Sequence, residues 1–163
     1  MPVVSSQLKQ TVHERWLAAA IDTYQGPTAE FLILEKDPFR NPIGHALKVA
    51  LSVLLDELFG EMRTAIFVPA LEDIIRIRAV QDFTPSQAVG FLFLLKEILR
   101  SELTGPADLL RAFEDRIDEM AGVGFDLFME CREKIYAARA DEARRRTHVL
   151  ERMHLGAPER YTR

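Results

Sequence analysis

The segment from Arg76 to Leu95, RIRAVQDFTPSQAVGFLFLL, predicts how the chain turns from one helix into the next. Its Thr84-Pro85-Ser86-Gln87 stretch has the pattern of a capping box, in which Thr84 caps the amino end of a helix and Gln87 bonds back to it. The helix that follows, as far as about Leu103, is apolar around most of its circumference. We therefore expect this helix to lie at the centre of the fold.

The same segment contains the first candidate site, which combines Arg78, Asp82 and Gly90. Arg78 falls on the apolar side of its own helix, and Asp82 follows one turn later. A buried guanidinium is costly unless it is paired, so this spacing favours an Arg78–Asp82 ion pair that ties the helix to its neighbours. The alternative is that Arg78 contacts an anion or a protein partner. Gly90, within the central helix, indicates that another backbone or a ligand packs closely there.

Helical periodicity extends through almost the whole chain, and strand-like alternation is hard to find. Glycine and proline at 26–27, at 60 and at 105–106 separate the periodic segments. We expect an all-α bundle of about five to six helices with a long C-terminal helix. The earlier helices are predicted over about 6–24, 41–59, 69–82 and 84–103, with a short piece over 28–35.

The last helical pattern begins after Gly105-Pro106 and is the longest. If it is unbroken from 107 to 142, it forms a rod of about 54 Å. A compact domain of this chain length has a radius of gyration of about 15 Å. Either Gly122-Val123-Gly124 bends the helix, or its far end projects from the bundle and pairs with something else. The strongly polar extension over about 140–163 is expected to fray.

Apolar or small residues recur along the last helix at alternating steps of three and four, which is the spacing of a coiled-coil seam. We expect part of this seam to form the contact of a homodimer. The seam residues assigned to that contact are Ile117, Met120, Leu127 and Cys131.

Composition narrows the possible functions. The 163 residues fit a single domain, 1–163, and the formal net charge of −4 argues against a nucleic-acid partner. Cys131 is the only cysteine, which excludes an intramolecular disulfide and a cysteine-based zinc site. The longest apolar run, Ala88 to Leu95, is far short of the ~20 residues that span a bilayer. With no signal-peptide pattern at the start, we expect a cytoplasmic protein without a membrane partner.

Motifs of common catalytic sites are missing from the sequence. It contains no His-x-x-x-His pair, no Gly-x-Ser-x-Gly and no phosphate-binding glycine loop. Only His13 could face a core, and a histidine there is more often hydrogen-bonded than bound to a metal. We therefore expect no enzyme activity, no cofactor and no metal site. Cys131 is interpreted as a small buried apolar residue, with a redox role as the weaker alternative.

Two stretches, 70–100 and 125–152, together resemble the N-terminal domain of RsbRD-type proteins, which are co-antagonists of the RsbT kinase in bacterial stress signalling. IRAVQDFTPSQAVGF is the most specific part, DPFRNPIGHAL fits the same family, and the resemblance covers about Trp16 to Arg152. It implies a globin-like bundle that does not require haem, that dimerises and that feeds a signal helix leading, in full-length relatives, to a STAS domain. The sequence ends at Arg163, without room for a STAS domain of ~100 residues, so a free-standing input domain is expected.

Three functional hypotheses follow from these patterns. The first is a non-enzymatic sensor or adaptor domain that homodimerises through its last helix, with Gly122 to Gly124 as its flexible point, and signals to an unidentified protein partner by changing helix packing. The second is a haem or small-molecule binding protein whose pocket lies between the central helix and the Arg78 helix. The third is a thiol redox switch at Cys131.

Overall fold

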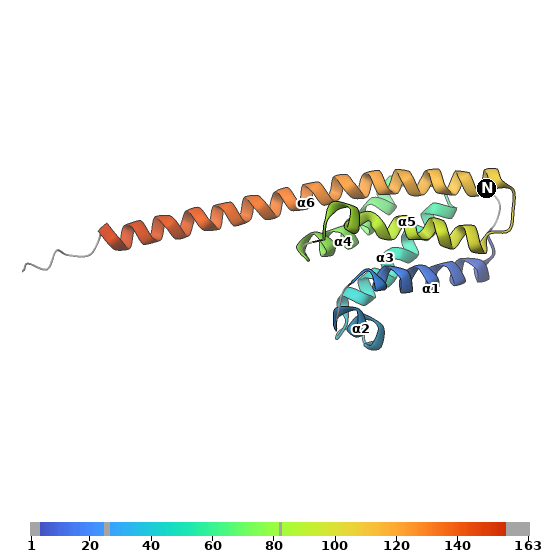
Figure 1. Ribbon diagram of the computed structural model, residues 1–163, viewed down its shortest axis with the longest axis horizontal. Coiled ribbons are helices and arrows are strands. Elements are labelled where there is room, and N and C mark those ends of the chain that lie inside the picture. The colour runs from blue at the N-terminus through green and yellow to red at the C-terminus, as the bar shows by residue number, and fades with distance from the viewer. Residues whose placement is uncertain (1–3, 25–26, 82, 156–163) are drawn as a thin grey trace, which may run out of the picture.

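The computed structural model describes residues 4–24, 27–81 and 83–155, and all regular structure in these ranges is helical. The predicted all-α class is therefore confirmed. In Figure 1, five helices form a bundle against the first half of the sixth, and the second half of the sixth projects away from it. The helices are α1 (Ser6–Asp22), α2 (Pro27–Leu34), α3 (Pro42–Phe59), α4 (Thr64–Val80), α5 (Pro85–Glu102) and α6 (Ala107–Leu155).

The capping box at the start of α5 forms as predicted. Thr84 Oγ1 accepts a hydrogen bond from the backbone N–H of Gln87 at 3.3 Å, and the Gln87 side chain accepts one from the Thr84 N–H at 3.0 Å. Pro85 occupies the first turn, where its missing N–H costs nothing. The helix that it starts packs between α1 and α6 (Figure 1), although Phe93 and Leu94 on its outer side are exposed.

The core lies where α1, α3, α4, α5 and the first half of α6 meet. Trp16 joins α1 to α5, because its indole N–H donates to the backbone carbonyl of Phe91 at 2.7 Å and its ring stacks on the Phe91 ring. Full burial of each large apolar side chain stabilises the fold by roughly 1.5–3 kcal/mol. Other side chains with no accessible surface include Leu51, Leu54, Phe67, Leu71, Leu92 and Phe113.

The turn between α3 and α4 depends on Glu57. Its buried carboxylate accepts a hydrogen bond from the backbone N–H of Arg63 at 2.8 Å and pairs with the guanidinium of the same residue at 2.5 Å. The next helix then begins at Thr64, so the prediction that it begins near Pro69 is wrong. Phe67 is fully buried and holds the first turn against the core, while Pro69 lies on the exposed side.

The long C-terminal helix is continuous over 49 residues, about 74 Å at 1.5 Å per residue. Gly122 and Gly124 lie inside it and its far end projects from the bundle, whereas the pairing of that end stays a prediction. The expected fraying of the polar extension is wrong as far as Leu155. Alanine, arginine and glutamate favour a helix there, and the Arg146–Glu142 pair at 2.6 Å supports it one turn apart.

Close helix packing occurs at Gly124 rather than at Gly90. A Cβ atom added at Gly124 would lie 3.3 Å from Val89 Cγ1 and 3.6 Å from Leu71 Cδ2, whereas one at Gly90 would meet no atom within 4 Å. The predicted close approach at Gly90 is therefore wrong. Among these two glycines, Gly124 is instead the one at which α6 approaches α4 and α5 closely.

We expect Gly90→Ala to raise the free energy of unfolding by about 0.5–1 kcal/mol, since alanine lowers the entropy of the unfolded chain and meets open space in the helix. Gly124→Ala should gain less, because its methyl group presses on Val89. Urea unfolding followed by circular dichroism measures both variants. A larger gain at Gly124 than at Gly90 would contradict this packing.

The hydrogen bond with the Arg63 side chain lowers the pKa of Glu57 below its ordinary value. A lowered pKa means that this carboxylate stabilises the fold at neutral pH and loses that contribution as the pH falls below about 4.5. Glu57→Gln should therefore show a smaller loss of stability between pH 7 and pH 3 than the wild type. Urea unfolding at the two pH values, with equal losses in the two proteins, would refute the role of Glu57.

Candidate functional site

Arg78 lies in the last turn of α4 and has no accessible surface. Its guanidinium donates to the backbone carbonyls of Ala20 at 3.3 Å and Gln87 at 3.2 Å, and to Thr23 Oγ1 at 2.9 Å. Two of these acceptors belong to the carboxyl end of α1, and the third belongs to the first turn of α5. One side chain thus joins the ends of three helices.

Aromatic rings complete the surroundings of this guanidinium. Its carbon lies 4.9 Å from the ring centroid of Tyr24, 5.0 Å from that of Phe83 and 4.8 Å from that of Phe91. Cation–π attraction offsets part of the hydration that a buried guanidinium loses. Burial lowers the pKa of Arg78; burial also raises the pKa of Tyr24, and the Arg78 cation opposes that rise.

The predicted partner Asp82 lies outside the described residues, so the Arg78–Asp82 ion pair stays a prediction. Because Arg78 is fully buried, its guanidinium faces the interior and is not offered to a surface partner. Ile75, Arg78 and Phe91 all lack accessible surface, and the pocket that the small-molecule hypothesis places between α4 and α5 stays a prediction.

The predicted dimer contact is wrong for two of its four residues, because they are buried within the bundle. Ile117 and Met120 have no accessible surface and pack inside their own bundle, so neither can meet a second chain in this structure. Leu127 and Cys131 are half-buried and pack against the same core. A spacing of three and four residues fits the buried face of a long helix as well as a coiled coil, and burial assigns this one to the bundle.

A second face of α6 remains at the surface, about a third of a turn around the helix axis from the buried face. Its residues are spaced by three, four or seven positions, which keeps them on one side of the helix, and they run from the bundle onto the projecting part. Phe125 is 46% exposed, Met129 41% and Tyr136 54%. We call this face the outer stripe, and it comprises Phe125, Met129, Tyr136, Ala140, Ala143, Thr147 and Leu150.

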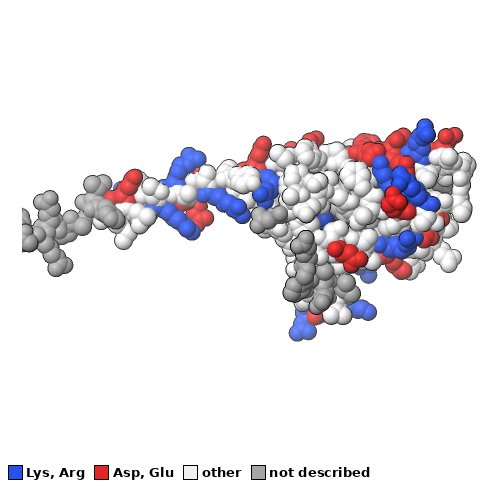
Figure 2. Space-filling view, viewed as in Figure 1, with Lys and Arg blue, Asp and Glu red and all other residues white. Residues whose placement is uncertain are grey.

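The space-filling view shows the projecting part of α6 with uncharged surface between blue and red side chains (Figure 2). Arg132 links this part to the bundle. Its guanidinium donates to the backbone carbonyl of Ala79 at 3.1 Å and to the Tyr136 hydroxyl at 2.7 Å. The outer stripe is therefore bonded, through one arginine, to the residue that follows Arg78.

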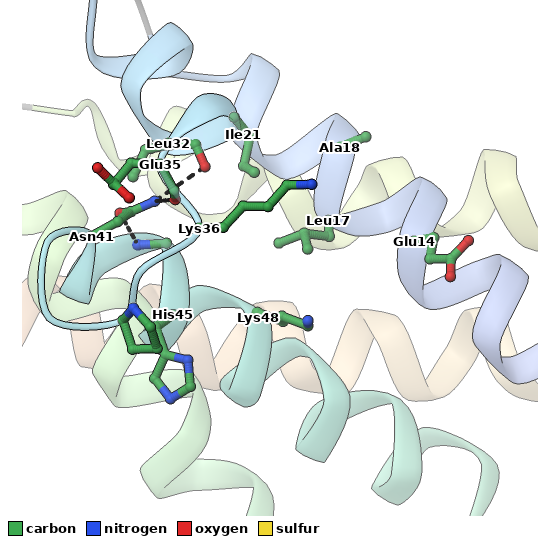
Figure 3. A pocket seen from close by; sticks show the side chains of 12 residues that line it. Glu14, Leu17, Ala18, Ile21, Leu32, Glu35, Lys36, Asn41, His45 and Lys48 are labelled. Atoms are coloured by element: carbon green, nitrogen blue, oxygen red, sulfur yellow. Dashed lines mark hydrogen bonds between the residues drawn. The ribbon is translucent and has the colours of Figure 1, made fainter.

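A groove of about 680 Å³ opens beside α1 and the start of α3 (Figure 3). We call it the α1–α3 groove. Apolar side chains from α1 and α2 form its floor, and the segment after α2 contributes to its rim. The floor residues are Leu17, Ile21 and Leu32, with Ala18 at the exposed edge, and the charged or polar rim residues are Glu14, Glu35, Lys36, His45 and Lys48.

Asn41 fixes the wall of the α1–α3 groove. Its buried amide donates to the backbone carbonyls of Leu32 at 3.2 Å and Glu35 at 2.9 Å, and its side-chain oxygen caps α3 by accepting the Gly44 N–H at 2.8 Å. A side chain at Gly44 would collide with this amide. The sequence shows the cap at Asn41 but not the groove, because residues from three separate segments form it.

The described ranges contain no group of three His, Cys, Asp or Glu side chains that could hold a metal ion. His13 Nε2 lies 3.0 Å from the backbone carbonyl of Lys48, the hydrogen-bonded setting that its position predicts. Among the helices that the structure describes, none is long and apolar enough to cross a membrane.

We expect Arg78→Ala to lower the free energy of unfolding by roughly 2–4 kcal/mol, because it removes three hydrogen bonds between helices and opens a cavity. Arg78→Lys keeps the charge but loses the planar fork of donors, so its free energy of unfolding should lie between those of the wild type and Arg78→Ala. Arg76→Ala is the matched control on the same helix, since Arg76 is exposed and pairs only with Glu72 among the described residues. Equal thermal stabilities of Arg78→Ala and Arg76→Ala would contradict the role of Arg78.

Comparison with known proteins gives a family and one partial relative. The family model of the RsbT co-antagonist protein rsbRD N-terminal domain matches residues 10–143, which include α3 to α5 and most of α1 and α6. An uncharacterized protein of Archaeoglobus fulgidus is 31% identical over 74 residues, which are 45% of this chain and 49% of that protein. The chain thus spans about half the length of that relative.

No solved structure matches the chain, so the expected likeness to globins stays a prediction. The family match is much more extensive than the match to the archaeal protein. It covers the capping box, Arg78 and its acceptors, and the outer stripe as far as Ala143. The chain therefore belongs to the RsbRD N-terminal domain family, a family of signalling domains rather than a known enzyme family.

Proposed function

We propose that the protein is a non-enzymatic sensor or adaptor module of a stress-signalling system, which acts through protein–protein contacts and helix repacking. Family membership supports the signalling role. The observation that carries the mechanism is α6, a single helix that belongs both to the core and to a surface outside the bundle.

The two halves of α6 lie in different environments. Phe113, Ile117 and Phe128 are buried in the bundle, whereas all residues from 136 to 153 are exposed. The part from 130 to 155 spans about 39 Å at 1.5 Å per residue. Because a continuous helix moves as a stiff body, a small change in the packing of its first half displaces its far end by more.

Contacts around α4 supply a route for such a change. Arg78 holds the end of α4 to α1 and α5, and the next residue, Ala79, accepts a hydrogen bond from Arg132 of α6. Arg132 in turn donates to Tyr136 in the outer stripe. Repacking of the bundle at Arg78 would thus alter the outer stripe directly.

Charge supports a second copy of the chain as one occupant of the outer stripe. Residues 139–152 contain five arginines and three carboxylates, whereas residues 107–133 contain eight carboxylates and three arginines. An antiparallel pair would place the basic part of one α6 along the acidic part of the other. The homodimer proposed here therefore uses the outer stripe in place of Ile117 and Met120.

The test is the molar mass in solution by sedimentation equilibrium. We expect a dimer that weakens between 0.05 and 0.5 M salt, since salt screens the charges that align the helices. Ala143→Glu with Leu150→Glu places two carboxylates in the outer stripe and should give a monomer with unchanged helix content. Ala138→Glu with Val149→Glu adds the same charge on another face of the helix and should leave the dimer intact.

A monomer at every concentration and salt would sink the homodimer, and equal effects of the two double variants would sink its assignment to the outer stripe. Each sample is also measured with and without reductant. Cys131 is a half-buried free thiol, and the redox-switch alternative predicts a dimer that reductant abolishes.

A further inference from the structure

The α1–α3 groove has an apolar floor beneath two lysines that the contacts of the fold do not use. Lys36 extends across the groove with its ammonium group towards Leu17 and Ala18, and Lys48 lies on the facing helix α3 (Figure 3). We infer that this groove binds a small monocarboxylate with an apolar body.

The charges around the groove favour an anion. Glu35 pairs with Arg40 at 3.6 Å, whereas Glu14 accepts a hydrogen bond at 2.9 Å from the neutral Gln10 amide and keeps its negative charge. Within the described residues, neither lysine forms an ion pair or a side-chain hydrogen bond. Two lysines against one carboxylate without an ionic partner leave a net positive charge at this rim, and a carboxylate is its natural complement.

The apolar floor of the groove favours a ligand whose remaining part is apolar. Ile21 and Leu32 are each only 6% exposed and form the deepest part of the floor, and Leu17 beside them is half-buried. An alkyl or aryl body would remove this surface from water, which inorganic phosphate could not do. The Asn41 amide is already engaged by α2 and α3, so it holds the wall and is not needed by the ligand.

Such a ligand would bridge α1 to the segment between α2 and α3. Since α1 is also held by Arg78, occupancy of the groove would act on the same helix end that Arg78 fixes. That consequence rests on the proposed signalling function, whereas binding itself does not. A failure to bind and a failure to dimerise are therefore separate results.

Isothermal titration calorimetry with decanoate, below its micelle-forming concentration, tests the inference on the full chain. We expect one site, with binding weakened about tenfold in the Lys36→Ala, Lys48→Ala double variant. Lys134→Ala with Arg145→Ala removes the same charge from α6 and should bind decanoate as the wild type does. Ala18→Trp fills the groove at an exposed position and should abolish binding without a change in thermal stability.

Decanol tests whether binding needs the carboxylate, and inorganic phosphate tests whether it needs the apolar body. We expect decanol to bind more weakly than decanoate and to be insensitive to the lysine substitutions, and phosphate alone not to bind. Equal binding of decanol and decanoate would overturn the anion preference, and binding of phosphate as tight as that of decanoate would overturn the apolar body. No heat of binding with decanoate, or the same loss in the control variant, would overturn the site.

Discussion

A buried guanidinium organises this fold. Arg78 gives up its hydration in the core, and the cost is offset only because carbonyls of α1 and α5, the Thr23 hydroxyl and three aromatic rings surround it. Ala20 and Thr23 lie at the carboxyl end of α1, and Gln87 lies in the first turn of α5. The arrangement therefore fixes where α1 ends and α5 begins relative to α4. The position of α5 between α1 and α6 follows from that junction and from the bond of Trp16 to Phe91.

On this foundation α6 has two roles. Its first half completes the core, with Gly124 allowing close approach to Val89 and Leu71, and its second half leaves the bundle as a stiff arm. Arg132 connects them through Ala79 and Tyr136. The proposed signalling role needs an element that both responds to packing and presents a surface, and α6 has one half in the core and one half outside the bundle. The α1–α3 groove lies beside α1, the helix whose carboxyl end is bonded to Arg78.

Local chemistry in the sequence predicted much of the architecture. The capping box at Thr84 and the cap at Asn41 both form, and the helical period gave the all-α class with its long last helix. The predictions that failed concern which side of a helix faces the core and which side faces the surface. The steps of three and four at Ile117 and Met120 suit a bundle face and a dimer face equally, so only burial decides between them. The sequence likewise does not show whether Gly90 or Gly124 packs against another helix, because that depends on their neighbours in space. The α1–α3 groove is not visible in the sequence, because separate segments form it.

The central claim is that one continuous helix joins the core to an exposed contact surface. Hydrogen–deuterium exchange along α6, measured over a range of protein concentrations, tests it most directly. The account predicts that amides from 113 to 128 exchange as slowly as those of α5 at every concentration. Amides from 136 to 150 should gain further protection as the chain associates. Rapid exchange of amides 136–150 at all concentrations would contradict the account. Faster exchange of amides 113–128 than of the α5 amides would contradict it as well.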